Sequence, residues 1–144
     1  MPTIVVANIP AEEFALRESL QAVPDLAVES QRVVEKGEGL VMPLIWVRSA
    51  DGETVQAALA DDSSVHSASR IANYENESLY HMEWKRGVEL AVQIMTEDQS
   101  VILDLYGTSD GWQLRSMFPN RDTLARTVEF CENHGLGFDV RRVR

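Results

Sequence analysis

Three histidines and one cysteine are the side chains best suited to metal or nucleophilic chemistry in this sequence. His81 and Glu83 stand two positions apart, a spacing that puts both on one face of a strand and could begin a metal site. A zinc site needs three or four converging ligands, however, and no H-x-x-H, C-x-x-C or H-E-x-x-H motif is present. Cys131 and His134 stand three apart on a predicted helix, where a thiol could pair with a base. We favour a core position for Cys131 and a helix-end position for His134.

Serine and phosphate chemistry also lack their usual signatures. The sequence has no G-x-S-x-G motif, and Gly37-Glu38-Gly39 is not continued by G-K-[ST] or by a third glycine before a helix. The acidic pairs Asp61-Asp62 and Glu97-Asp98 fall at the ends of predicted elements, where we expect them to be solvated. We therefore predict that the chain is not an enzyme, with no catalytic residues, no metal and no cofactor.

The three tryptophans are the candidates for ligand binding. Trp46, Trp84 and Trp112 each fall on a predicted strand, near the start or end of an element. A tryptophan can stack on a planar ligand or anchor a partner interface. The alternative is burial between a sheet and its helices, which is common for this residue type.

The last quarter of the chain predicts most clearly the elements that would position such residues. Residues 112–118 alternate between apolar and polar positions as a half-buried strand does. Asn120 is a suitable N-cap, and Asp122 falls in the first turn of the helix that follows. Gly135 would end that helix at its C′ position, and residues 138–142 alternate again as a final strand.

The same order of elements occurs twice. Residues 2–74 predict strand 3–7, helix 10–23, strands 26–34 and 40–47, a short helix after Asp51-Gly52, and strand 65–74. Residues 75–144 predict strand 79–84, a helix carrying Val88, Ala91, Val92 and Met95, strands 101–106 and 112–118, helix 120–134, and strand 138–142.

This order predicts an α+β fold of tandem βαββαβ, or ferredoxin-like, units. In such a unit the crossovers place both helices on one face of an antiparallel sheet. We expect a first unit at residues 1–74 and a second at 75–144, or one compact domain over 1–144. The two units could join by their edges into a wide sheet or pack face to face.

Charge is the next informative feature. The chain of 144 residues carries 23 acidic and 13 basic residues, a net charge of −10, and only two of the basic residues are lysines. An acidic, lysine-poor surface suits a halophilic protein in a salt-rich cytoplasm, where screening weakens like-charge repulsion, and the alternative is an ordinary acidic protein. Nucleic-acid binding begins instead with a basic patch. The only basic cluster is Arg141, Arg142 and Arg144, which we interpret as the solvated face of an edge strand, so we expect no direct nucleic-acid contact.

The sequence also favours a cytoplasmic protein without a membrane segment. The longest apolar run, residues 40–47, is too short to cross a bilayer. Met1-Pro2 leads straight into a predicted strand without the basic and apolar regions of a secretory signal. A single cysteine excludes an internal disulfide and suits a reducing compartment.

Several motifs in order along the whole chain resemble haloarchaeal bacterio-opsin activator (Bat-like) transcription regulators. The motifs are residues 9–16 and 20–24, Gly37-Glu38-Gly39-Leu40-Val41-Met42-Pro43 with Trp46-Val47, and a closing segment of Phe118, Pro119, Asn120, Arg121 and Asp122, then Phe130-Cys131 and His134-Gly135. The resemblance implies an archaeal regulatory module that precedes a C-terminal helix-turn-helix, which is absent from this chain. We interpret the closing motif residues as structural, because the resemblance supplies no ligand residues.

Three hypotheses follow. The first is a regulatory or sensory module that binds a small-molecule effector or a partner, or forms a homodimer, and acts on a DNA-binding segment outside this chain. The second is a ligand-binding module of ferredoxin-like fold that acts alone. The third is an enzyme of that fold, with His81 or His134 as acid or base.

Overall fold

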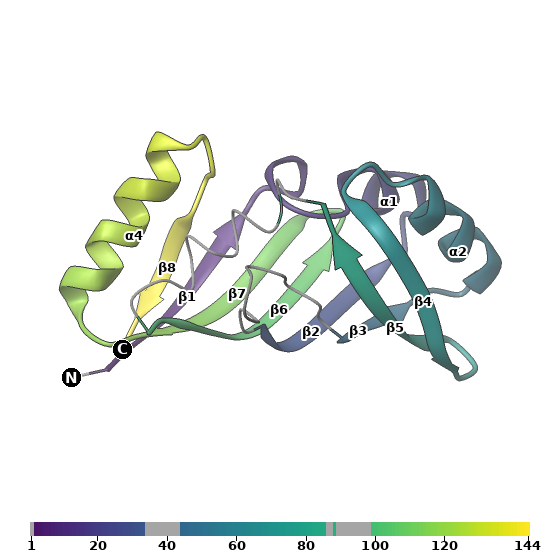
Figure 1. Cartoon of the computed structure of the whole chain (residues 1–144), viewed down its shortest axis with the longest axis horizontal. Coiled ribbons are helices and arrows are strands. Elements are labelled where there is room, and N and C mark those ends of the chain that lie inside the picture. Colours follow the sequence, from purple (N-terminus) through teal and green to yellow (C-terminus); the bar gives the residue numbers. More distant parts are fainter. Residues whose placement is uncertain (1, 34–43, 86–87, 89–98) are drawn as a thin grey trace.

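The computed structural model describes residues 2–33, 44–85, 88 and 99–144 (Figure 1). Within these ranges the chain forms eight strands, three α-helices and one short 3-10 helix. In chain order they are β1 (Thr3–Ile9), η1 (Ala11–Glu13), α1 (Arg17–Ala22), β2 (Ala27–Val33), β3 (Leu44–Arg48), α2 (Gly52–Asp61), β4 (Val65–Asn73), β5 (Glu77–Trp84), β6 (Val101–Thr108), β7 (Gly111–Phe118), α4 (Arg121–Asn133) and β8 (Asp139–Val143).

All eight strands join one antiparallel sheet in the order β4-β5-β3-β2-β6-β7-β1-β8. The predicted α+β class with an antiparallel sheet is therefore confirmed. Of the two arrangements left open by the sequence, the structure has the wide sheet, which β2 and β6 join at its middle.

The predicted tandem of ferredoxin-like units is not confirmed in that form. β1 pairs with β7 and β8 of the second half, whereas β5 pairs with β3 and β4 of the first half. The first strand of each half therefore lies among the strands of the other half. The order of elements could not reveal this exchange. Alternation of apolar and polar residues determines which face a strand buries, but it does not determine which strand pairs with it.

The sheet has one apolar inner face and one mixed outer face. Val5, Ala7 and Ile9 of β1 are buried on the inner face, as are Leu114 and Phe118 of β7. Helices α1 and α2 lie at the β4 end of the sheet and α4 lies at the β8 end (Figure 1). Each helix contributes buried side chains to the core, so the helices and the inner face form one hydrophobic layer.

The first predicted helix is interrupted. Residues 10–23 were expected to form one helix, but the structure has η1 and the six-residue α1, with Leu16 between them at φ 60°. The interruption turns Phe14, Ala15 and Leu16 into the core, where all three are buried. The Leu16 amide donates to the Ser64 hydroxyl at 2.9 Å instead of bonding within a helix. Tertiary contacts therefore override the local helical pattern.

The closing strand, helix and strand are confirmed. The Asn120 side chain accepts a hydrogen bond from the Thr123 amide at 2.8 Å, as an N-cap does. Gly135 has φ +72°, the left-handed geometry expected of a C′ residue. The weakly patterned strand 65–74 is also confirmed, as β4. The predicted glycine loop 37–39, the start of strand 40–47 and the helical positions Ala91, Val92 and Met95 lie outside the described residues.

Gly107 of β6 lies against the Trp112 ring. A Cβ atom at this position would stand 2.8 Å from ring carbons of Trp112, closer than packing permits. We expect Gly107→Ala to lower the free energy of unfolding by about 1–3 kcal/mol, because a buried indole has little room to move. Denaturant titration measures the loss. Gly52→Ala is the matched control, since its Cβ would meet no atom within 4 Å, and an equal loss in both variants would contradict the expectation.

Candidate functional site

A hollow lies where β1, the β6–β7 hairpin and the connection from α4 to β8 meet, and we call it the end pocket. It has a cavity volume of about 760 Å³ and is lined by residues 8–10, 106, 108, 110–113, 132 and 137–139. That size falls in the range of small-molecule sites. Three segments form its wall: the end of β1, the β6–β7 hairpin, and the connection from α4 to β8.

Close contacts join the hairpin to β1, and the connection before β8 to η1. Gly111, in the hairpin, has φ +131°, and a Cβ there would stand 3.1 Å from the Ile9 carbonyl oxygen of β1. The Gly137 amide, before β8, donates to Glu13 Oε1 at 2.9 Å. Both close approaches favour glycine, because a side chain would meet the neighbouring segment. Glycine at these two positions therefore allows the segments around the end pocket to pack closely.

The end pocket combines apolar surface with acidic groups. Pro10 is half-buried and supplies apolar surface, Phe138 adds a small exposed part, and Tyr106 on the outer face is 41% exposed. Other lining residues offer hydrogen bonds or negative charge: Asn8, Thr108, Asp110, Gln113, Glu132 and Asp139. Among the residues that the structure describes, thirteen line the end pocket, and none of these is lysine or arginine. The site therefore offers apolar contact, amide hydrogen bonds and carboxylates, and suits binding better than covalent catalysis.

A second hollow of about 530 Å³ adjoins the end pocket on the outer face and shares Asn8 and Gln113 with it. Its lining includes Arg115, Arg141 and Arg142. Two of these guanidinium groups already have partners, since Arg115 pairs with Asp104 at 2.9 Å and Arg141 pairs with Asp139 at 3.1 Å. All three arginines are exposed, and Arg141 and Arg142 lie on the edge strand β8, the placement expected for this cluster.

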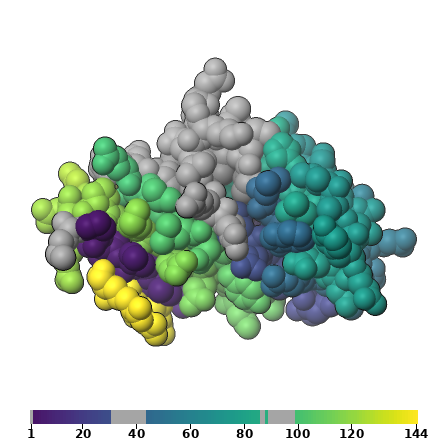
Figure 2. Space-filling view, turned by 90° about the horizontal axis from the view of Figure 1, so that it is seen from below, coloured from purple at the N-terminus to yellow at the C-terminus, as the bar shows by residue number. Residues whose placement is uncertain are grey.

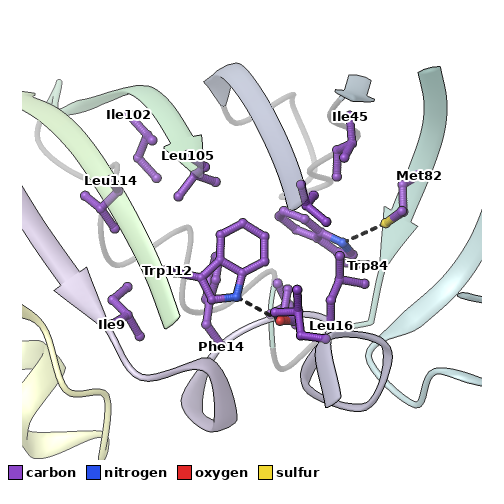
Figure 3. Close-up of a cluster of buried hydrophobic side chains, with 14 of the residues drawn as sticks. Ile9, Phe14, Leu16, Ile45, Met82, Trp84, Ile102, Leu105, Trp112 and Leu114 are labelled. Carbon is purple, nitrogen blue, oxygen red and sulfur yellow. Dashed lines mark hydrogen bonds between the residues drawn. The ribbon is translucent and has the colours of Figure 1, made fainter. Parts of the chain in front are cut away.

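Two of the three candidate tryptophans are buried in the core (Figure 3). Trp84 and Trp112 are 2% and 1% exposed, and Phe14 contacts both rings edge-on at centroid distances of 5.8 and 5.2 Å. The Trp112 indole donates to the Ala15 carbonyl oxygen at 3.0 Å. These rings offer almost no free face for stacking, although Trp112 lines the inner wall of the end pocket. Trp46 is half-buried on the outer face of β3, 6.0 Å from the Tyr74 ring.

The histidines and the cysteine do not converge. His81 is half-buried on the outer face of β5, whereas His134 is exposed at the C-terminus of α4, with Nδ1 2.8 Å from the Phe130 carbonyl oxygen. Cys131 is buried, and burial raises the pKa of its thiol to about 11. A thiol with this pKa is almost fully protonated near pH 7 and is a poor nucleophile. Within the described ranges, no group of three His, Cys, Asp or Glu side chains could hold a metal ion.

Asp62 is a structural residue that sequence reasoning misplaced. We expected Asp61-Asp62 to be solvated, but Asp62 is 3% exposed. Its carboxylate accepts hydrogen bonds from the amide and hydroxyl of Ser19 (2.9 and 2.6 Å) and from those of Ser64 (2.9 and 2.6 Å). Burial alone would raise the pKa of Asp62, but these bonds favour the ionised form and hold the pKa below its usual value. The signal available in the sequence was the neighbouring Ser63-Ser64 pair, which offers hydroxyl donors.

The closing motif residues have structural positions. Phe118 is fully buried and Asn120 caps α4, while Arg121 and Asp122 are exposed in its first turn. His134 and Gly135 end that helix, and Pro119 is half-buried between β7 and α4. The earlier motif at residues 37–43 lies outside the described residues.

Comparison with known families defines the class of the protein as a domain associated with regulators. A family model matches residues 8–144, nearly the whole chain. The chain belongs to this family, BAT, described as the GAF and HTH_10 associated domain. The resemblance to Bat-like regulators is therefore confirmed, and the family supports a regulatory role. No curated protein matches the chain, and neither does any solved structure.

None of the helices in the described residues combines the length and the apolar character needed to cross a bilayer.

Proposed function

We propose that this domain is the regulatory module of a helix-turn-helix transcription regulator. It takes up a signal as a small-molecule effector or a partner and passes it to a C-terminal DNA-binding segment outside this chain. The observation that carries the proposal is the family match over residues 8–144, since the family is described by its association with GAF and helix-turn-helix domains. The end pocket is the place where an effector would bind.

Strand β8 is a suitable route from the end pocket to a segment that follows it. Phe138 and Asp139 at its start line the end pocket. At its other end, Arg144 exchanges two backbone hydrogen bonds with Ile4, at 3.0 and 2.8 Å. Within the described residues β8 pairs with β1 alone, and Figure 2 shows it at the surface beside β1. An edge strand held on one side moves at a lower cost than an inner strand, so an effector at Phe138 could displace it.

The alternative is a ligand-binding module that acts alone, with no DNA-binding segment in the native protein. The intact mass of the native gene product in its source cells separates the two. We expect a mass above the 16.1 kDa of this chain by a helix-turn-helix segment of roughly 60–70 residues, by analogy with the family. A mass equal to 16.1 kDa would contradict direct promoter control and favour the alternative.

We also propose that the chain itself makes no nucleic-acid contact and catalyses no reaction. The net charge of −10 supports the first point, because phosphate binding needs a positive surface. The high pKa of the Cys131 thiol supports the second, as does the placement of His81 on β5 and His134 at the end of α4.

The same charge supports a halophilic source. We expect the melting temperature to rise between low and high KCl, because salt screens the repulsion among the acidic residues. Thermal unfolding followed by circular dichroism measures the shift. A midpoint that stays constant or falls with KCl would contradict this part of the proposal.

A further inference from the structure

We propose that the end pocket binds an organic cation, a small molecule with an apolar body and a positively charged amine or ammonium group. This inference rests on the proposed function and names the chemical class of its effector. Three features of the end pocket support it: its size, the negative charge of its wall and the exposure of Tyr106.

The apolar part of the end pocket fits the body of such a ligand. Pro10 and Phe138 line the end pocket with apolar atoms, and Tyr106 lines it from the outer face of β6. Phe138 is 7% exposed and is therefore held in place by packing. Tyr106 is 41% exposed, so part of its ring is free to meet a ligand. A cation is attracted to the negative face of an aromatic ring.

The negative charges on the wall of the end pocket favour a positively charged ligand. Asp110 and Glu132 belong to the hairpin and to α4, and both line the end pocket. Within the part of the chain that the structure describes, neither carboxylate has an ion-pair partner. Asp139 also lines the end pocket and is only partly neutralised by Arg141, at 3.1 Å. Among the described residues of the wall, an anionic ligand would meet these carboxylates without a lysine or arginine to compensate its charge, whereas a cation would pair with them.

The amide side chains of Asn8 and Gln113 stand directly opposite each other on β1 and β7, at the border between the end pocket and the arginine-lined hollow. They separate the acidic wall from Arg115 and Arg142. An anionic group would therefore favour the neighbouring hollow, and a cationic group the end pocket.

Three aromatic probes of similar size but different charge test this assignment. Benzyltrimethylammonium, benzyl alcohol and benzoate are titrated separately into the ¹⁵N-labelled protein, at the lowest KCl concentration that keeps it folded, because concentrated salt would screen the charges that are compared. We expect benzyltrimethylammonium to shift the amide signals of Gly111, Gln113 and Gly137 in a saturable way. We expect benzyl alcohol to bind at least 10-fold more weakly, and benzoate to leave these signals unchanged. Equal or tighter binding of benzoate at these amides would overturn the inference, as would the absence of saturable shifts with the cation.

A second experiment replaces the carboxylates of the wall with neutral amides. Asp110→Asn combined with Glu132→Gln removes two carboxylates without changing side-chain size, and we expect at least a 10-fold loss of affinity for benzyltrimethylammonium. The matched control is Glu53→Gln combined with Asp61→Asn, which removes two exposed carboxylates of α2. Equal affinity in the two double variants would overturn the role of the wall carboxylates. These titrations test only the chemical class of the ligand. If they fail, the regulatory role is still tested by transcript levels in the native cells.

Discussion

Replacing Trp112 by alanine should remove more stability than any other single truncation in the core. We expect Trp112→Ala to lower the free energy of unfolding by about 3–5 kcal/mol, a large part of the 5–15 kcal/mol typical of a domain. The ring is 1% exposed, contacts Phe14 edge-on and lies against Gly107. Its indole N–H also donates a hydrogen bond to the Ala15 carbonyl oxygen, in the non-helical segment between η1 and α1.

Two further variants separate the packing of Trp112 from its hydrogen bond. Trp112→Phe keeps an aromatic ring but loses the donor to Ala15, so its loss should be smaller and should include about 1–2 kcal/mol for the unpaired carbonyl group. Trp46→Ala is the control on the outer face, where the ring is half-buried, and should cost less than Trp112→Ala. Guanidinium titration at constant KCl measures all three. Equal losses for Trp112→Ala and Trp46→Ala would contradict the core assignment.

The second large effect is expected at Asp62. We expect Asp62→Ala to lower the free energy of unfolding by about 2–4 kcal/mol, because it leaves two backbone amides and two hydroxyls without their acceptor. The carboxylate joins Ser19 of α1 to Ser64, which precedes β4. Asp61→Ala is the neighbouring control and should cost little, since Asp61 is exposed.

The lowered pKa of Asp62 also predicts a pH dependence. An unfolded aspartate titrates near pH 3.9, and hydrogen bonds from Ser19 and Ser64 hold the folded pKa below the usual value. The folded protein therefore binds the proton less well than the unfolded chain does, so the ionised group stabilises the fold above about pH 4. This contribution is lost as the pH falls through the folded pKa.

Asp62→Asn isolates this effect, because asparagine does not titrate. The difference in unfolding free energy between the wild type and Asp62→Asn should be constant near neutral pH and shrink below about pH 4. Chemical unfolding at several pH values measures it. A difference that stays constant down to pH 2 would show that the carboxylate of Asp62 does not titrate with the expected shift.

The sequence predicted the elements best where local signals agree. The structure has the predicted strand before Asn120, the Asn120 cap of α4 and the glycine that ends α4. The residues that predict these features all lie within about 25 positions. The break at Leu16 and the burial of Asp62 were missed because contacts with residues more than 40 positions away determine them. The exchange of β1 and β5 was missed for a similar reason, since strand partners are chosen between distant segments.

The end pocket was beyond sequence reasoning because its wall comes from residues 8–10, 106–113 and 132–139, which meet only in the folded sheet. Tryptophan was a reasonable guide to ligand binding, yet the structure buries Trp84 and Trp112 and leaves Tyr106 as the exposed ring of this site. Carboxylates such as Asp110 and Glu132 were not distinguishable among 23 acidic residues until the fold brought them together.

If an effector in the end pocket controls transcription, filling the end pocket in the native gene should change transcript levels. Gln113→Trp places a large ring into the end pocket from an exposed strand position. Ser69→Trp places the same ring at an exposed position of β4, at the far edge of the sheet. Transcript levels in the two strains are compared with the wild type at equal protein abundance. We predict that Gln113→Trp changes a set of transcripts that a complete gene deletion also changes, whereas Ser69→Trp leaves them at wild-type levels. Wild-type levels of every transcript in the Gln113→Trp strain would contradict the claim.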